Sequence, residues 1–331
     1  MASRGPSTGY GELLRDVVAK AGRAPSILNT QPWRWRIHED RLELLADRSR
    51  QVTAIDPDGR LLTLSCGAAL HHARVVLAAA GHELEVTRHP DPDQPNLLAR
   101  LRLTGAPHEV SWEDTYLHRS IRNRRSDRRP FPATAPVPAD TRAALDRVAQ
   151  AERAWLHHVP AGQIIYLRSA AVLAQRAQSA DDTYLRELRA WAHRRRASGE
   201  GVPPDTFVAA VDRPVPLRDF SLDEEIMHHP GLGDDQYAEY LVLATPADRP
   251  IDWLRAGEAT SAVWLTATYR ELAVSVLSDV VEVPDAREVV RSLLLRPGYP
   301  QLVLRVGFDM QPTPPKASPR RPWEDTIDPT P

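Results

Sequence analysis

The residues most able to do chemistry are an arginine cluster between residues 119 and 131. The segment 119–131, RSIRNRRSDRRPF, holds six arginines within eleven residues, with serines among them. Guanidinium groups and a hydroxyl donate several charge-assisted hydrogen bonds to a phosphate monoester. The cluster is therefore a candidate phosphate site. A solvated basic helix end is the plain alternative, and contact with nucleic acid is disfavoured because no aromatic residues interleave with the arginines.

Two further segments combine residues that could touch a ligand. Residues 24–33, APSILNTQPW, form a loop by their prolines and polar side chains and lead into a strand. Ser26 and Asn29 could line a site there, or could simply cap a turn. Near the C-terminus, 318–322 reads SPRRP, a basic pair that could close a phosphate site or belong to a surface tail.

Other chemistry is less well supported. Cys66 is expected at a helix start, where the helix dipole could activate it, but a small buried core residue is the better interpretation. Six of the twelve histidines form the adjacent pairs His71-His72, His157-His158 and His228-His229. Adjacent residues point in different directions on a helix and make poor chelates, so we expect no metal. Neither a G-x-G-x-x-G segment nor a Walker loop is present.

Composition limits the partners and the compartment. The 331 residues carry a net charge of −2, so no strong field attracts nucleic acid or an anionic membrane. We expect neither as a partner. No run approaches the roughly 18 to 20 apolar residues that cross a bilayer, and the N-terminus lacks the apolar core of a signal peptide. One cysteine cannot form an internal disulfide, which fits a reducing, cytoplasmic location.

Hydrophobic periodicity gives the elements that would position these residues. It predicts a short amphipathic helix over 12–22 and strands around 33–37 and 42–44. A helix over 68–80 is so rich in Ala, Leu and Val that it should be buried on most sides. A further strand is predicted at 97–103.

The C-terminal part repeats this order weakly. A strand is predicted over 240–244, a second core helix over 256–267, and a strand over 302–307 that matches the one at 97–103. We therefore expect two copies of one unit, a first half over 1–110 and a second over 111–331. An insertion over about 155–236 has a helical stretch near 185–193 and proline-rich loops, which predicts either a lid or a surface excursion.

Together these motifs resemble the FMN-dependent nitroreductases. The run Arg124-Arg125-Ser126-Asp127-Arg128 is similar to the phosphate motif of that family, and 24–33 is similar to its Pro-Ser-x-x-Asn-x-Gln-Pro-Trp segment. The order of the two is reversed here, which resembles the Acg-like branch, as do 56–60 and 64–70. The resemblance implies an α+β fold of two tandem, unequal nitroreductase-like halves forming an intramolecular pseudo-dimer, with an inserted lid-like segment. Such a chain is expected as a monomer or a loose homodimer.

The resemblance also implies which residues hold FMN. Those at the phosphate, ribityl chain and pyrimidine edge would be Arg124, Arg125, Ser126, Arg128, Arg320 and Arg321. Those lining the isoalloxazine from the other half would be Pro25, Ser26 and Ile27, with Asn29 bracing their loop. Since Ser3-Arg4-Gly5-Pro6 is a poor substitute for the arginine motif, one FMN per chain is expected.

The implied function is an FMN-dependent oxidoreductase. Electrons would pass from a reduced nicotinamide through the flavin N5 to a nitroaromatic or other conjugated acceptor, with no side chain required as acid or base. Two alternatives stay open: a non-catalytic protein that sequesters FMN under its lid, and a biosynthetic flavin dehydrogenase that uses oxygen as acceptor.

Overall fold

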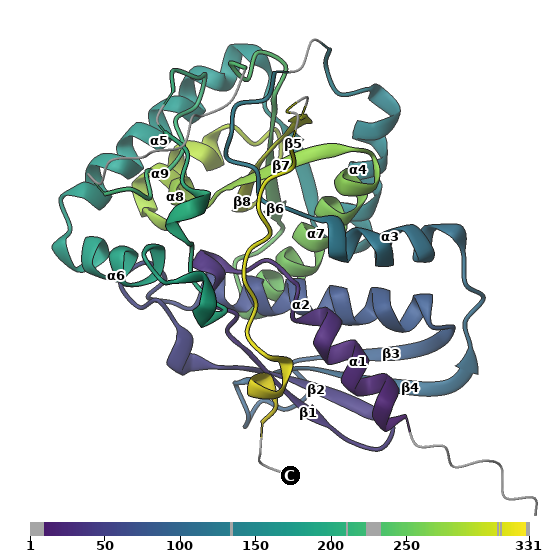
Figure 1. The fold of residues 1–331 in the computed structure, drawn as a ribbon. Coiled ribbons are helices and arrows are strands. Elements are labelled where there is room, and N and C mark those ends of the chain that lie inside the picture. The colour runs from purple at the N-terminus through teal and green to yellow at the C-terminus, as the bar shows by residue number, and fades with distance from the viewer. Residues whose placement is uncertain are drawn as a thin grey trace, which may run out of the picture.

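Two four-stranded antiparallel sheets, one in each half of the molecule, form the framework of the fold. The computed structural model describes residues 10–132, 135–209, 211–222, 233–309, 311 and 313–328. The first sheet has the order β1-β2-β4-β3 and the second β5-β6-β8-β7, so the two halves share one topology (Figure 1). The strands are β1 (Trp33–Ile37), β2 (Arg41–Ala46), β3 (His82–Arg88), β4 (Leu97–Pro107), β5 (Trp155–His158), β6 (Glu239–Thr245), β7 (Leu272–Leu277) and β8 (Tyr299–Phe308).

Two long helices fill the space between the sheets. Helix α2 (Arg60–Ala79) packs on the first sheet, α7 (Pro250–Tyr269) packs on the second, and the two pack on each other (Figure 1). A Cβ at Gly67 would overlap the carbonyl oxygen of Leu254, and one at Gly257 would overlap that of Leu64. The helix backbones therefore touch at this pair of glycines, which joins the halves into one core.

Helix α2 begins eight residues earlier than hydrophobic periodicity predicts. The carboxylate of Asp56 accepts hydrogen bonds from the backbone N–H groups of Leu61 and Leu62, at 3.0 and 2.8 Å. Gly59, in the left-handed region at φ 71°, turns the chain into the helix. An acidic side chain that satisfies the first free N–H groups extends a helix beyond its apolar stretch. Helix α7 likewise begins earlier than predicted, at Pro250, whose fixed φ suits the first helical turn.

Helix α2 also meets the length and hydropathy criteria for a membrane span, contrary to the expectation that no run approaches them. Of the relevant window, 89% is buried inside the molecule. An apolar helix enclosed on all sides by protein is a core helix.

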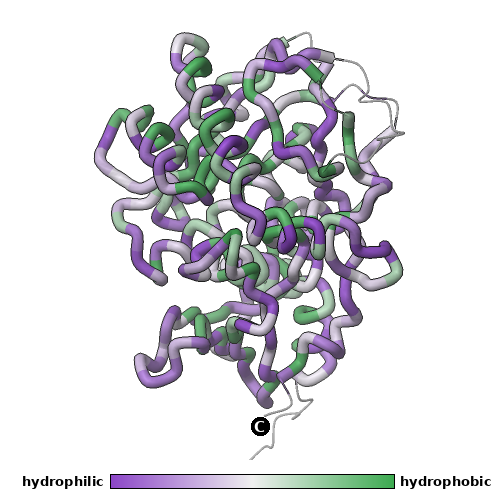
Figure 2. The backbone as a smooth tube through the Cα atoms, turned by 90° about the vertical axis from the view of Figure 1, so that its left-hand side faces the viewer, coloured by the Kyte–Doolittle hydropathy of each residue, from purple (hydrophilic) through white to green (hydrophobic). Residues whose placement is uncertain are grey.

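Shorter helices surround this framework. They are α1 (Gly11–Ala21), α3 (Trp112–Asn123), α4 (Ala139–Ala151), α5 (Ile164–Ser179), α6 (Asp182–Ala192), α8 (Asp279–Glu282) and α9 (Pro284–Ser292). Hydrophobic segments lie mainly in the interior, and hydrophilic ones occupy much of the periphery (Figure 2). After β8 the chain crosses the front of the molecule to the first sheet (Figure 1), where Ile327 bridges Trp35.

The two halves differ in the segment that comes after their first strand. Strand β5 pairs with β6 and is part of the second sheet, so the stretch without a counterpart in the first half begins after it. This stretch includes α5 and α6, and we call its described residues from 159 to 222 the insertion. Residues 182–207 of the insertion reach the first half, where Tyr184, Leu188 and Phe207 share a buried cluster with Leu28 and Val52.

Candidate functional site

One cavity of about 350 Å³ lies where both halves, the insertion and the C-terminal tail meet. This volume falls within the range of small-molecule sites. The segments lining it are the loop 25–29, the start of α2, the arginine segment 124–129, the end of β7, insertion residues 201–208 and 217–220, and tail residues 313–320. Segments that are distant in sequence thus enclose a single space.

The arginine segment is fixed against the second sheet. Ser126 bridges Val274 of β7, and the backbone N–H of Asp127 donates to the carbonyl of Val274 at 2.9 Å. From β8, the buried Arg305 donates to the carbonyls of Asp127 and Arg129, both at 2.8 Å. The segment therefore runs as an extended strip along β7, and all of its residues from 124 to 129 except Arg125 line the cavity.

Arg124 and Arg320 line the cavity without a carboxylate partner among the described residues. Arg124 donates to the carbonyl of Arg23 at 3.1 Å and stacks on Trp264, 4.5 Å from its centroid. Arg320 donates to Asn29 Oδ1 and to the carbonyls of residues 23, 24 and 319. The Nε of each arginine is buried and lacks a hydrogen-bond partner within the described part of the chain.

The electrostatic environment of this pair favours an anion. Burial lowers the pKa of Arg124 well below its usual value, and the positive charges of Arg320 and Arg125 lower it further. Burial, Arg23 and Arg125 lower the pKa of Arg320 to about 10. Buried charges of one sign are costly unless an opposite charge joins them. A phosphate would supply that charge.

The other predicted arginines lie differently. Arg128 lines the cavity and stacks on Phe220 at 4.6 Å; burial and the neighbouring Arg218 lower its pKa to about 10. Arg125 does not line the cavity, since its Nη1 donates to the carbonyls of residues 122 and 124, but its charge reaches Arg320. Arg321 also lies outside the lining and donates to the carbonyls of residues 31 and 325.

The loop 25–31 has an unusual backbone that its polar side chains stabilise. Leu28, Asn29 and Gln31 have φ values of 45°, 55° and 50°, in the left-handed region that is costly for most residues. Ser26 Oγ accepts from the N–H of Gln31 at 3.0 Å, so the turn-capping interpretation of Ser26 describes one contact correctly. Ser65 Oγ of α2 accepts from the N–H of Ile27 at 3.0 Å. Pro25, Ser26, Ile27 and Asn29 all line the cavity.

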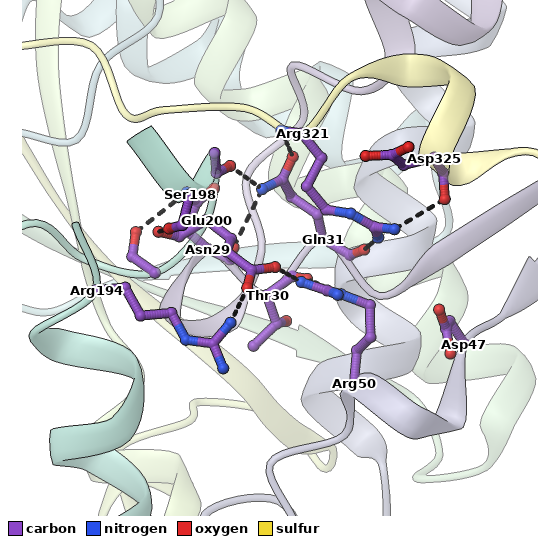
Figure 3. Close-up of polar contacts among 12 residues, drawn as sticks. Asn29, Thr30, Gln31, Asp47, Arg50, Arg194, Ser198, Glu200, Arg321 and Asp325 are labelled. Atoms are coloured by element: carbon purple, nitrogen blue, oxygen red, sulfur yellow. Dashed lines mark hydrogen bonds and ion pairs between the residues drawn. The ribbon is translucent and has the colours of Figure 1, made fainter. Parts of the chain in front are cut away.

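Asn29 and Gln31 join this loop to the insertion and to the tail (Figure 3). Asn29 Nδ2 donates to the carbonyls of Gly201 at 3.1 Å and Pro319 at 3.0 Å, while its Oδ1 accepts from Arg320 at 2.9 Å. Gln31 Nε2 donates to the carbonyl of Gly199 at 2.8 Å, and its Oε1 accepts from the N–H of Arg321. These two amides determine how the cavity is closed.

An ion-pair network beside these amides holds the insertion on the first half. Glu200 of the insertion lies between Arg50 of the first half and Arg194, and both arginines donate to its carboxylate (Figure 3). Glu187 accepts from the N–H groups of Ala54 and Ile55, both at 2.9 Å. The insertion thus lies over the cavity, and Glu187 and Glu200 attach it to the first half.

Sequence reasoning missed a third group of lining residues. Phe207 and Phe220 of the insertion stack on each other with centroids 6.2 Å apart, and both line the cavity with Arg218. Ser278 and Asp279 line it at the end of β7. No local motif marks them, because tertiary folding alone brings them together.

Cys66 lies inside α2 and not at its start. Its thiol is fully buried and donates to the carbonyl of Pro32 at 3.2 Å. Burial raises the pKa of this thiol. A buried thiol with a raised pKa is a poor nucleophile, which agrees with the core interpretation. Within the ranges that the structure describes, no three His, Cys, Asp or Glu residues gather as a metal site.

Curated proteins of Mycobacterium tuberculosis are similar to the chain over nearly its whole length. One, named "Putative NAD(P)H nitroreductase Rv3131", is 38% identical over 328 residues, covering 96% of this chain and 91% of the relative. A second, which carries the same description with the name acg, is 34% identical over 321 residues, covering 96% and 95%. No protein-family model matches the chain.

Among solved structures, similar chains include an FMN-dependent nitroreductase from Mycobacterium smegmatis in complex with NADPH. It is 14% identical, covers 59% of this chain and 88% of that one, and has a TM-score of 0.37. The full-length similarity to the mycobacterial relatives defines the class. The chain belongs to the nitroreductase family, in the branch that contains acg, as its motifs indicate.

Proposed function

We propose that the protein is an FMN-dependent oxidoreductase of the nitroreductase type, which oxidises a reduced nicotinamide and reduces a conjugated or nitroaromatic acceptor. The observation that carries the proposal is the pair Arg124 and Arg320, one buried and one half-buried guanidinium group without carboxylate partners in the described part of the chain, which line a cavity of suitable size. The names of the mycobacterial relatives agree with it. The buried, unpaired Cys66 fits a reducing cytoplasm.

The chain's own residues would bind and orient the cofactor. Arg124 and Arg320 would hold the phosphate, with Ser126 beside it and the charge of Arg125 behind, while Arg321 would support the tail. Arg128 would reach the pyrimidine edge. Pro25, Ser26 and Ile27 would line the ring, and Asn29 would keep their loop in place. When bound, FMN supplies hydride exchange at N5.

The insertion shapes what else can enter. Phe207 and Phe220 offer an aromatic wall against which a planar second ligand can lie, and the insertion keeps bulk water from that side. The same covering favours one alternative function, FMN sequestration, because Asn29 and Gln31 tie the insertion closed over the cavity.

The test begins with the purified protein's visible absorbance and the identity of the released chromophore. We expect bound FMN that bleaches when NADPH is added without oxygen. Bound FMN that stays oxidised with both NADPH and NADH would favour sequestration. A protein that neither contains FMN nor takes it up would refute both functions.

A matched pair of variants tests the phosphate site. Arg124→Met keeps an apolar side chain on Trp264 but removes the charge, so we expect FMN to bind roughly 10- to 100-fold more weakly, the worth of a charge-assisted hydrogen bond. Arg122→Met removes an exposed arginine of α3 and should bind FMN as the wild type does. Arg125→Ala should weaken binding less than Arg124→Met. Equal FMN affinity in all three variants would contradict the assigned site.

A further inference from the structure

The cavity is also lined by a second pair of polar residues, Arg218 and Asp279, whose electrostatic partners differ from those of Arg124 and Arg320. Arg218 comes from the insertion, and Asp279 begins α8 just after β7. The pKa of Arg124 is perturbed by Arg320 and Arg125, whereas that of Arg128 is perturbed by Arg218 and Asp127. The positive charges of the cavity therefore form two groups. Arg124 and Arg320 belong to the group proposed to hold the phosphate, and Arg218 belongs to the other.

Arg218 is held by one side of its guanidinium group. Its Nη2 donates to Glu282 Oε1 at 2.5 Å, and Glu282 Oε2 accepts from the hydroxyl of Tyr184 at 3.0 Å and from Gln178 at 3.1 Å. Burial opposes the charge, but Glu282 and Tyr184 raise the pKa of Arg218 above its usual value. Its Nη1 is buried and has no hydrogen-bond partner among the described residues. A fixed cationic donor is thus left unused.

Asp279 offers the complementary unused acceptor. The residue is 1% exposed and lines the cavity, and its Oδ2 finds no hydrogen-bond partner in the described ranges. Burial raises the pKa of Asp279 to about 6, against the opposing charge of Arg218 and with the support of Glu282. The other titratable groups of this region are Tyr184 on α6, which raises the pKa of Arg218, and Asp56 and Arg60 at the start of α2. Burial is the main influence on the pKa of Asp56 and of Arg60, and the charge of Glu282 is a smaller one.

Two unused polar atoms in one cavity indicate a ligand that uses both. A buried donor or acceptor without a partner is costly, so a ligand that satisfies it gains specificity. Arg218 and Asp279 line the same cavity, and the charge of each affects the pKa of the other. A donor and an acceptor in one neighbourhood match a group that carries both an acceptor and a donor, such as an amide: the carbonyl accepts from Arg218 and the N–H donates to Asp279. The stacked Phe207 and Phe220 beside them favour a planar, aromatic ligand.

We propose that Arg218 and Asp279 together bind the amide edge of a planar ligand in this cavity. Two ligands could present that edge: the pyrimidine ring of the flavin itself, or the carboxamide of a second ligand. This proposal rests on the proposed function only where it names these two candidate ligands. The chemistry of recognition comes from the donor and acceptor alone.

Calorimetric titration with benzamide, benzoate and acetophenone tests the pair in the full chain without added flavin. Benzamide should bind best above pH 6, where Asp279 is ionised and accepts the amide N–H, and weaken as the pH falls to 5. Benzoate should show the opposite trend, because ionised Asp279 repels it. Acetophenone, which lacks the N–H, should bind roughly tenfold more weakly than benzamide at pH 8.

Two variants give the test its controls. In Asp279→Asn the pH dependence of benzamide binding should disappear, whereas Asp285→Asn, the same change at an exposed position of α9, should keep it. Repeating the titrations with FMN bound identifies the source. Benzamide that still binds assigns the pair to a second ligand; benzamide that is displaced, together with weaker FMN binding in Asp279→Asn, assigns it to the flavin edge.

The proposal is overturned by one combined result. Benzamide binding that is absent or independent of pH, together with an FMN affinity that Asp279→Asn leaves unchanged, would mean that the pair recognises no amide. FMN binding by the wild-type protein is measured separately. The proposed function can therefore hold when this inference fails.

Discussion

The two halves have the same strand order, yet the outer faces of their sheets are chemically different. When the two sheets are aligned by their strand registers and β-bulges, Arg102 of β4 occupies the same position as Arg305 of β8. The side chain of Arg102 is 53% exposed and pairs with Glu85, whereas that of Arg305 is fully buried and pairs with Asp235. The same residue type at the same sheet position therefore has two different roles.

The covering of the second sheet explains this difference. Glu43 and Arg100 form an ion pair on the outer face of the first sheet, and the corresponding positions of the second sheet are Val242 and Val303. Val242 and Val303 share a buried cluster with residues of α5. A sheet face against water takes charged residues, and a covered face must be apolar or fully paired. Divergence between the halves is thus explained by the insertion and the arginine segment.

The largest effect is expected when the two corresponding arginines, Arg305 and Arg102, are substituted. Arg305→Met leaves the buried Asp235 with Arg213 as its one remaining cationic partner in the described part of the chain and releases the carbonyls of the arginine segment, so the free energy of unfolding should fall by about 3–5 kcal/mol. Arg102→Met should change it by less than about 0.5 kcal/mol. Urea unfolding measures both. Similar losses in the two variants would refute the difference between the faces.

A second test addresses the contact that joins the halves. In Gly257→Ala the new methyl group meets the backbone of α2, which cannot move away without separating the helices, so we expect a loss of about 2–3 kcal/mol. Gly162→Ala, where a Cβ meets nothing within 4 Å, is the control. If the two substitutions had the same effect in urea unfolding, α2 and α7 would not be in backbone contact.

The smallest expected effect concerns the insertion, which only the second half has. Glu200→Gln weakens the ion pairs with Arg50 and Arg194, so hydrogen exchange in residues 182–207 should become faster while global stability falls by about 1 kcal/mol or less. Glu288→Gln, which removes an exposed pair on α9, is the control. Exchange that stays unchanged in 182–207 would mean that Glu200 does not hold the insertion closed.

The sequence predicts the repeated elements but not their limits or their surroundings. Alternation identifies β1, β4, β6 and β8, and apolar content identifies α2 and α7, because burial leaves a clear pattern in these elements. The start of α2 escapes prediction because the carboxylate of Asp56, outside the apolar run, sets it. Strands β3, β5 and β7 also escape prediction, β5 because its residues fall inside the range predicted as an insertion. Strand β3 has an exposed face and lies at the edge of its sheet, so its hydrophobic signal is weak.

The candidate site shows the same limit. Arg124, Arg320 and the loop 25–29 stand in motifs dense enough to recognise, and the structure brings them to one cavity. Arg218 and Asp279 stand in ordinary surroundings, and their importance arises from two atoms that folding buries without partners among the described residues. A sequence cannot show an unsatisfied hydrogen bond, because satisfaction depends on residues that are remote along the chain.

The path of the C-terminal tail determines when the cavity becomes complete. Asn29 and Arg320 are 291 residues apart, and Asp328 donates its N–H to the carbonyl of Trp35 at 2.8 Å. The loop around Asn29 must therefore wait for tail residues about 290 positions later in the chain before its cavity is complete. Contacts of such long separation form slowly. The cavity is thus incomplete until the tail has folded against the first half.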